Sequence, residues 1–167
     1  VWGNGRIDSG LMVNLMQSPD SVLTPDRADV SLRGSILLGG MIQHAESLQA
    51  LAELPARGLI ASSIVPSLLA KAREMRYPIV VTDGFGSVPM NSAAYKLLST
   101  SAKREVTLNA ESTDRYSGSR PEIIIPLPTT SEPPIPSETE SFAPGSQVRM
   151  RCAPATGRIG SILSIKP

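Results

Sequence analysis

The chain has 167 residues, a formal net charge of +1 and 41% hydrophobic residues, which is enough for one domain with an aliphatic core and a small appendage. Its single cysteine, Cys152, excludes an internal disulfide and a cysteine-rich metal site, and predicts a reducing, cytoplasmic setting. The sequence contains no apolar run of the roughly 20 residues that a membrane helix needs, so we expect no membrane contact. Because the chain starts at Val1 and not at a methionine, we expect a fragment or a processed product.

Residues 1–29 predict an irregular N-terminal arm. Asn4–Gly5 is a turn signal. Four apolar residues recur at the spacing of one helix face: Leu11, Met12, Leu15 and Met16. Two motifs follow, at 18–20 and 24–26, in which a hydroxyl residue precedes a proline and an acid; this order favours either a helix start or a surface loop.

Residues 30–127 predict an α/β domain with a small, mostly parallel sheet and flanking helices. Short apolar runs indicate parallel strands at 36–38, 59–61 and 79–82. Helical patterns follow them at 45–54, 66–75 and 91–98. Strands that alternate with helices at these lengths are typical of βα units. Further strands are expected at 105–110 and 122–127, and Pro126 favours an edge position for the second of these.

A candidate ligand site lies in the loop 82–92. In an open parallel sheet, ligands bind at the carboxyl ends of the strands. The candidate residues are Thr82, Asp83, Gly84, Gly86, Asn91 and Ser92. Pro89 stands where a dinucleotide fingerprint would have its third glycine, so the match to that motif is incomplete. The alternative interpretation is structural: the glycines and Asp83 form a turn, and Asn91 caps the next helix.

Residues for catalysis are sparse. His44 stands alone, so it has no histidine partner for a metal and no place in a Ser–His–Asp arrangement. Ser62–Ser63 lacks the flanking glycines of a nucleophile elbow. Arg151 beside Cys152 would lower the pKa of the thiol, but a cysteine in a hairpin more often fills apolar space. The sequence therefore favours a protein without enzymatic activity, metal or cofactor.

The last forty residues change character twice. Residues 128–144 are rich in proline, serine and threonine, carry acids without a basic residue, and predict an extended linker. Residues 145–167 carry basic charges without an acid: Arg149, Arg151, Arg158 and Lys166. Apolar residues on both sides of a turn at 154–157 predict a β-hairpin, with Arg149 and Arg151 on one face of its first strand.

The segment 142–165, FAPGSQVRMRCAPATGRIGSILSI, resembles a KOW motif, the hairpin signature of certain SH3-like barrels in ribosomal proteins and transcription elongation factors. The matching residues are Gly145, Val148, Arg149, Pro154, Gly157, Gly160, Ile162 and Ile165. Ala153 departs from the glycine that usually precedes the proline. A full barrel needs about five strands, so the hairpin would be part of a barrel. The resemblance implies contact with RNA or with a protein.

Two functions follow from these patterns. The first is a non-enzymatic binding or scaffold module whose basic hairpin, through Arg149, Arg151, Arg158 and Lys166, contacts RNA or a protein partner. The second is a domain, enzymatic or not, that binds a small molecule or nucleotide through the loop 82–92. For the arginines, a solvated strand face that keeps a sheet edge soluble is an equally good interpretation.

Overall fold

The computed structural model describes residues 1–114, 116–126, 141–149 and 159–165. The chain divides into two units, Val1–Leu127 and Pro128–Pro167, each of which is described by itself.

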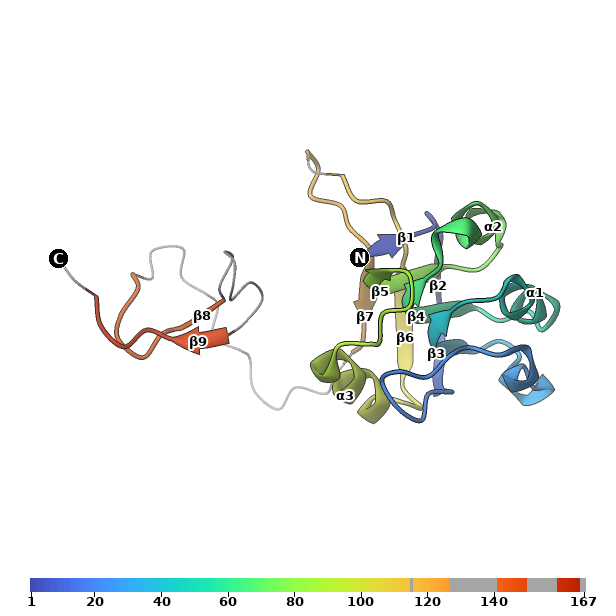
Figure 1. Ribbon diagram of the computed structural model, residues 1–167, viewed down its shortest axis with the longest axis horizontal. Helices are drawn as coiled ribbons and strands as arrows, with labels where there is room; N and C mark the ends of the chain where they lie inside the picture. Colours follow the sequence, from blue (N-terminus) through green and yellow to red (C-terminus); the bar gives the residue numbers. More distant parts are fainter. Residues whose placement is uncertain (115, 127–140, 150–158, 166–167) are drawn as a thin grey trace. The chain divides into compact units, whose positions relative to one another are not determined.

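The first unit is built on a seven-stranded mixed sheet with the strand order β1-β5-β4-β3-β2-β6-β7 (Figure 1). The strands are β1 (Trp2–Gly3), β2 (Ile7–Asn14), β3 (Ile36–Ile42), β4 (Gly58–Ile64), β5 (Ile79–Phe85), β6 (Glu105–Asn109) and β7 (Glu122–Ile124). The expected parallel pairing of 36–38, 59–61 and 79–82 is confirmed, because β3, β4 and β5 pair in parallel. The expectation of a mostly parallel sheet is wrong: β2–β3 is parallel as well, but β1–β5, β2–β6 and β6–β7 are all antiparallel.

The three expected helices are present. They are α1 (Ala45–Glu53), α2 (Leu69–Glu74) and α3 (Ser92–Thr100), and three single 3₁₀ turns accompany them: η1 (Pro25–Arg27), η2 (Val30–Leu32) and η3 (Pro66–Leu68). The helix expected at 66–75 begins as η3 and continues as α2. Asn91 caps α3 as predicted, since its side-chain oxygen accepts from the backbone N–H groups of Ala93 and Ala94.

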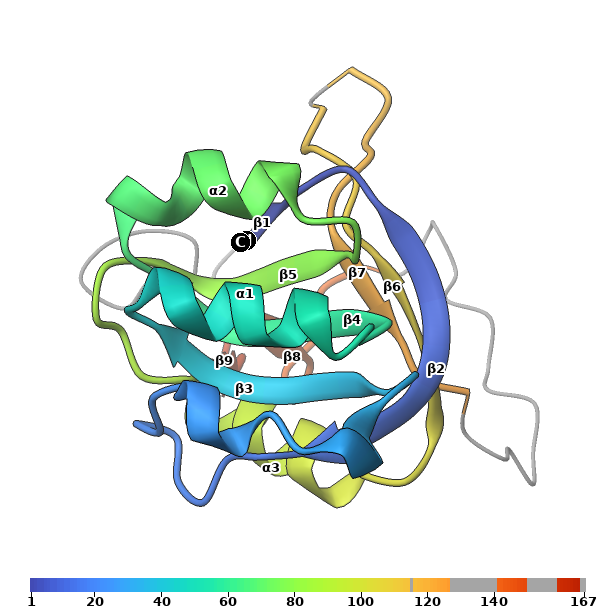
Figure 2. The ribbon, with the colours of Figure 1, turned by 90° about the vertical axis from the view of Figure 1, so that its right-hand side faces the viewer.

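The helices cover both faces of the sheet. Figure 2 shows α1 and α2 side by side across one face, with α3 on the other side. The sheet separates two clusters of buried residues. Leu37, Leu59 and Ile79 pack in one cluster with residues of α1. The next residue along each strand, Leu38, Ile60 or Val80, belongs to a second cluster, which includes Leu98 of α3. Successive side chains of a strand point to opposite faces, which explains why β3 and β4 are buried along their full length.

The N-terminal residues form two strands of the sheet. The interpretation of residues 1–29 as an irregular arm is wrong, because β1 and β2 are strands of the sheet. The helical spacing at 11–16 is also misleading, since β2 extends through Asn14. This strand pairs with two partners in succession: residues 7–11 pair with β6, and residues 12–14 pair with β3.

Burial explains the error. The buried residues of β2 are Gly10 and Met12, while Ile7 and Leu11 are exposed. Apolar residues of β2 therefore lie on both its exposed and its buried positions, so their spacing does not identify the buried face. A side chain at Gly10 would crowd the carbonyl oxygen of Gly34 and the side chain of Arg57.

In the second unit, β8 (Gln147–Arg149) pairs antiparallel with β9 (Ile159–Ser161), so the predicted C-terminal β-hairpin pair is present. Residues 128–140 of the expected linker lie outside the described part of the chain. Residues 141–144, its last four, form no helix or strand. Among the helices of the described residues, none has the length and apolar character required to cross a bilayer.

Candidate functional site

The carboxyl ends of β3, β4 and β5 are irregular where a ligand site was expected. Ala61 pairs with Val81 and Ser63 pairs with Gly84, so two residues of β5, Thr82 and Asp83, lie opposite Ser62 alone. The pairing of β3 with β4 shifts twice in the same region. Such bulges bend a strand and redirect its side chains, and they are frequent beside functional sites.

The predicted site residues in this region contact each other or the sheet. The Thr82 hydroxyl lies 2.6 Å from Asp83 Oδ2, to which it donates, and 3.2 Å from the carbonyl oxygen of Ala61. Gly84 and Gly86 have φ values of 121° and 95°, in the left-handed region that favours glycine, with open space where a side chain would be. β5 extends through Phe85, so Thr82, Asp83 and Gly84 belong to an irregular strand end, and the interpretation of Asp83 and Gly84 as turn residues is wrong.

The rest of the loop is held by hydrogen bonds to neighbouring strands. The Ser63 hydroxyl accepts from the Val88 N–H at 3.0 Å, and the Gln43 amide donates to the Ser87 hydroxyl at 3.2 Å. Asn91 caps α3, and Ser92, its first residue, is exposed. The Ser62 hydroxyl is buried and has no hydrogen-bond partner within the described ranges. The six candidate residues lie at the carboxyl end of β5 and the start of α3. None of them lines either of the two cavities described below.

The other candidates are placed as follows. His44 is exposed at the N-cap of α1 and makes no side-chain capping bond. The described ranges hold no group of three His, Cys, Asp or Glu residues that could bind a metal ion. Arg149 is the last residue of β8, whereas Arg151, Arg158, Lys166 and Cys152 lie outside the described residues.

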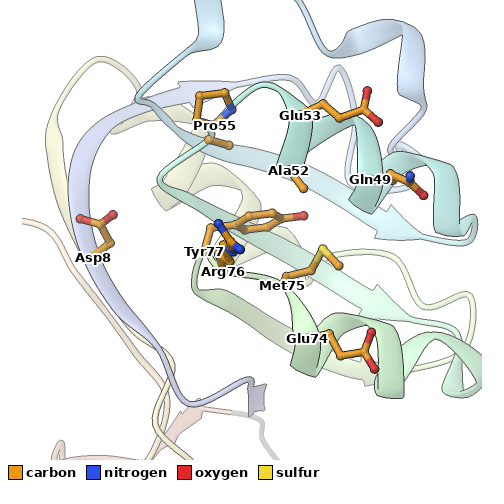
Figure 3. A pocket seen from close by; sticks show the side chains of 10 residues that line it. Asp8, Gln49, Ala52, Glu53, Pro55, Glu74, Met75, Arg76 and Tyr77 are labelled. Atoms are coloured by element: carbon orange, nitrogen blue, oxygen red, sulfur yellow. The ribbon is translucent and has the colours of Figure 1, made fainter.

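A cavity that the sequence did not predict lies between α1, α2 and β2 (Figure 3). Its volume is about 540 Å³. Its lining residues come from three stretches of the chain: Asp8, Gln49, Ala52, Glu53, Pro55, Ala56, Glu74, Met75, Arg76 and Tyr77. A second cavity of about 410 Å³ lies beside Trp2 and Arg73, and neither cavity is lined by residues of the loop 82–92.

The charged residues of the first cavity are unusually placed on their helices. α1 ends at Glu53 and α2 ends at Glu74, so each helix ends with a carboxylate at the negative end of its dipole. The last turn of α1 contains no basic residue, whereas the last turn of α2 contains Lys71 and Arg73. In the part of the chain that the structure describes, the one ion pair joins Arg120 and Glu122 at 3.4 Å, so neither helix-end glutamate is paired there.

Tyr77 forms part of the cavity wall and anchors α1. Its side chain is buried, and its hydroxyl donates to the carbonyl oxygen of Leu48 at 2.9 Å. Figure 3 shows its ring between Asp8 on one side and the residues of α1 and α2 on the other. Burial raises the pKa of the Tyr77 phenol, because the charged phenolate would lose its hydration.

This pKa predicts a loss of stability in alkali. Above about pH 10 the unfolded chain releases the Tyr77 proton while the folded chain keeps it, so the free energy of unfolding falls by up to about 1.4 kcal/mol per pH unit. We expect Tyr77→Phe to reduce this slope in urea unfolding measured from pH 8 to 11. Tyr116→Phe is the control, since the Tyr116 side chain is 91% exposed. Equal slopes for Tyr77→Phe and the unmodified chain would show that the Tyr77 phenol is not the cause of the alkaline loss of stability.

Comparison of the chain with protein-family models, with curated proteins and with solved structures finds no match in any of the three. The resemblance of 142–165 to a KOW motif therefore stays a prediction.

Proposed function

We propose that this protein is a non-enzymatic binding module whose C-terminal basic hairpin contacts the phosphates of RNA. The observation that carries the proposal is the segregation of charge: the residues 145–167 carry four basic side chains without an acid. The antiparallel pairing of β8 with β9 supports it, because a strand presents alternate residues on one face and Arg149 lies in such a strand. Arginine contacts phosphate through several N–H donors at once.

The alternative, a small-molecule or nucleotide site in the loop 82–92, has less support. The polar groups of that loop are used by the fold itself: Asp83 accepts from Thr82, and Asn91 accepts from the first N–H groups of α3. A ligand would have to compete with these bonds. The conformations of Gly84 and Gly86 need no ligand to explain them.

The RNA proposal is tested by the double substitution Arg149→Ala, Arg151→Ala. Removing two phosphate contacts should weaken binding of a single-stranded RNA oligonucleotide regardless of its sequence. The slope of log K against log salt should become shallower by about 0.7 for each lost contact. Fluorescence anisotropy of a labelled RNA, measured from about 50 to about 300 mM KCl, gives both the affinity and the slope.

The matched control is Asp83→Ala, which removes the acid of the strand-end loop and should leave RNA binding unchanged. A slope that the arginine substitutions do not alter would contradict phosphate contact. A nucleotide at one hundred times its dissociation constant raises the free energy of unfolding by about 2.7 kcal/mol. If a nucleotide stabilises the unmodified chain and Asp83→Ala abolishes that effect, the loop is the functional site and the RNA proposal is wrong.

A further inference from the structure

We propose that the cavity between α1, α2 and β2 docks a basic segment of a partner polypeptide. This site lies in the first unit and is independent of the RNA proposal. A lysine or arginine of the partner would bind the carboxylates at the rim, and an adjacent apolar side chain would cover the apolar part of the lining. The argument rests on the size of the cavity, its lining and the ends of the two helices.

The size and the lining fit a ligand. A volume of about 540 Å³ lies within the roughly 300–1,000 Å³ of most ligand pockets. Half of the lining residues offer apolar surface: Ala52, Pro55, Ala56, Met75 and Tyr77. Lys71 Nζ donates to Gln49 Oε1 at 3.1 Å, which joins α2 to α1 beside the cavity. The walls are therefore held together by contacts within the first unit.

The charges favour a cation. Asp8, Glu53 and Glu74 line the cavity against a single guanidinium, that of Arg76. The last carbonyl groups of a helix have no intrahelical N–H partner and carry partial negative charge. α1 ends with Glu53 and has no basic residue in its last turn, which is unfavourable for that helix, whereas Glu74 at the end of α2 is accompanied by Lys71 and Arg73. A bound cation removes the repulsion at α1, because it compensates the Glu53 carboxylate and the end of that helix together.

The positions of the carboxylates favour an extended occupant. Asp8 comes from β2, whereas Glu53 and Glu74 come from different helices, and Figure 3 shows Asp8 on the opposite side of Tyr77 from both. A polypeptide segment with more than one basic side chain can reach several of these groups at once. It also carries an apolar side chain next to the basic one, which can cover the apolar part of the lining. A metal ion or a simple amine has no such side chain.

The test uses the ¹⁵N-labelled chain and a capped eight-residue peptide of alternating lysine and leucine. We expect amide chemical shifts to change around the cavity, at 52–54, 56 and 75–77. The double substitution Glu53→Gln, Glu74→Gln should weaken peptide binding at least tenfold. Glu46→Gln is the matched control, because Glu46 is an exposed acid in the first turn of the same helix and does not line the cavity; it should change binding less than twofold.

Four results would overturn the proposal. The first is equal affinity of the double variant and the unmodified chain, provided that both show the same dispersion of amide signals. The second is a set of shifts centred on the acidic residues 128–144 and not on the cavity. The third is equal binding of the peptide in which glutamate replaces lysine. The fourth is spermidine binding as tightly as the peptide, which would make a free polyamine the occupant.

Discussion

Replacing Gly40 with alanine should lower the free energy of unfolding by about 4 kcal/mol or more, the range of severe core disruptions. A Cβ atom at Gly40 would lie 2.2 Å from the carbonyl oxygen of Ser21, and the residue has a φ of +78°. The neighbouring backbone cannot move away easily, because Met41 N donates to the Ser21 oxygen and Leu23 N donates to the Met41 oxygen, both at 2.9 Å. Urea unfolding at neutral pH measures the loss.

Gly86→Ala separates the two causes. Gly86 also has a positive φ, of +95°, but no atom lies within 4 Å of a Cβ built there. This substitution should cost only the conformational term, about 1–2 kcal/mol. If Gly86→Ala destabilised the chain as much as Gly40→Ala, the close approach of Ser21 to β3 would not be the reason for the glycine.

The second large effect is expected for Asn4→Ala, at about 3 kcal/mol. The Asn4 amide donates to the carbonyl oxygens of Ala72 and Tyr77 at 3.1 and 3.0 Å, and its oxygen accepts from Ile79 N at 3.0 Å. Truncation leaves three backbone groups between α2 and β5 without these partners, and an unsatisfied buried group costs about 1–3 kcal/mol. Thermal and urea unfolding of the variant measure the loss.

Asn4→Asp is the informative companion. Aspartate keeps the acceptor for Ile79 N but places a carboxylate oxygen against the two carbonyl oxygens. We therefore expect Asn4→Asp to be at least as destabilising at pH 7 as Asn4→Ala, despite its closer shape. Nearly unchanged stability in either variant would show that Asn4 acts only as a turn residue.

The sequence predicts the central βα units well because their signals are local. Each apolar run of 36–38, 59–61 and 79–82 is followed within a few residues by a helical pattern, and a helix that carries the chain back along the sheet makes the next strand parallel to the last. The direction of the outer strands depends on partners far along the chain. Ser9 and Thr107, whose side-chain oxygens lie 2.8 Å apart, are separated by 98 positions. No local pattern encodes such a pairing.

The candidate sites divide in the same way. The loop 82–92 could be found because strand-end loops follow from the βα pattern, and its Asn91 cap has a local signature. The cavity could not, since Asp8, the end of α1 and the segment 74–77 meet only after the sheet has formed. The available signal was the glutamate at the end of α1, a helix whose last turn has no basic residue.

The double pairing of β2 has a consequence for biosynthesis. The ribosome delivers β2 well before β6, which covers residues 7–11 and is complete only once residue 109 has been made. A nascent chain stopped after α3 would possess every helix of the described residues and still leave Met12, Ile36 and Ile60 without the cover of Val106 and Leu108. Such an intermediate exposes an unpaired strand edge and apolar surface, the features that lead incomplete chains to aggregate. Completion of the first unit therefore depends on release of its last strands, and truncated products ending near residue 100 should be substrates for chaperones and proteases.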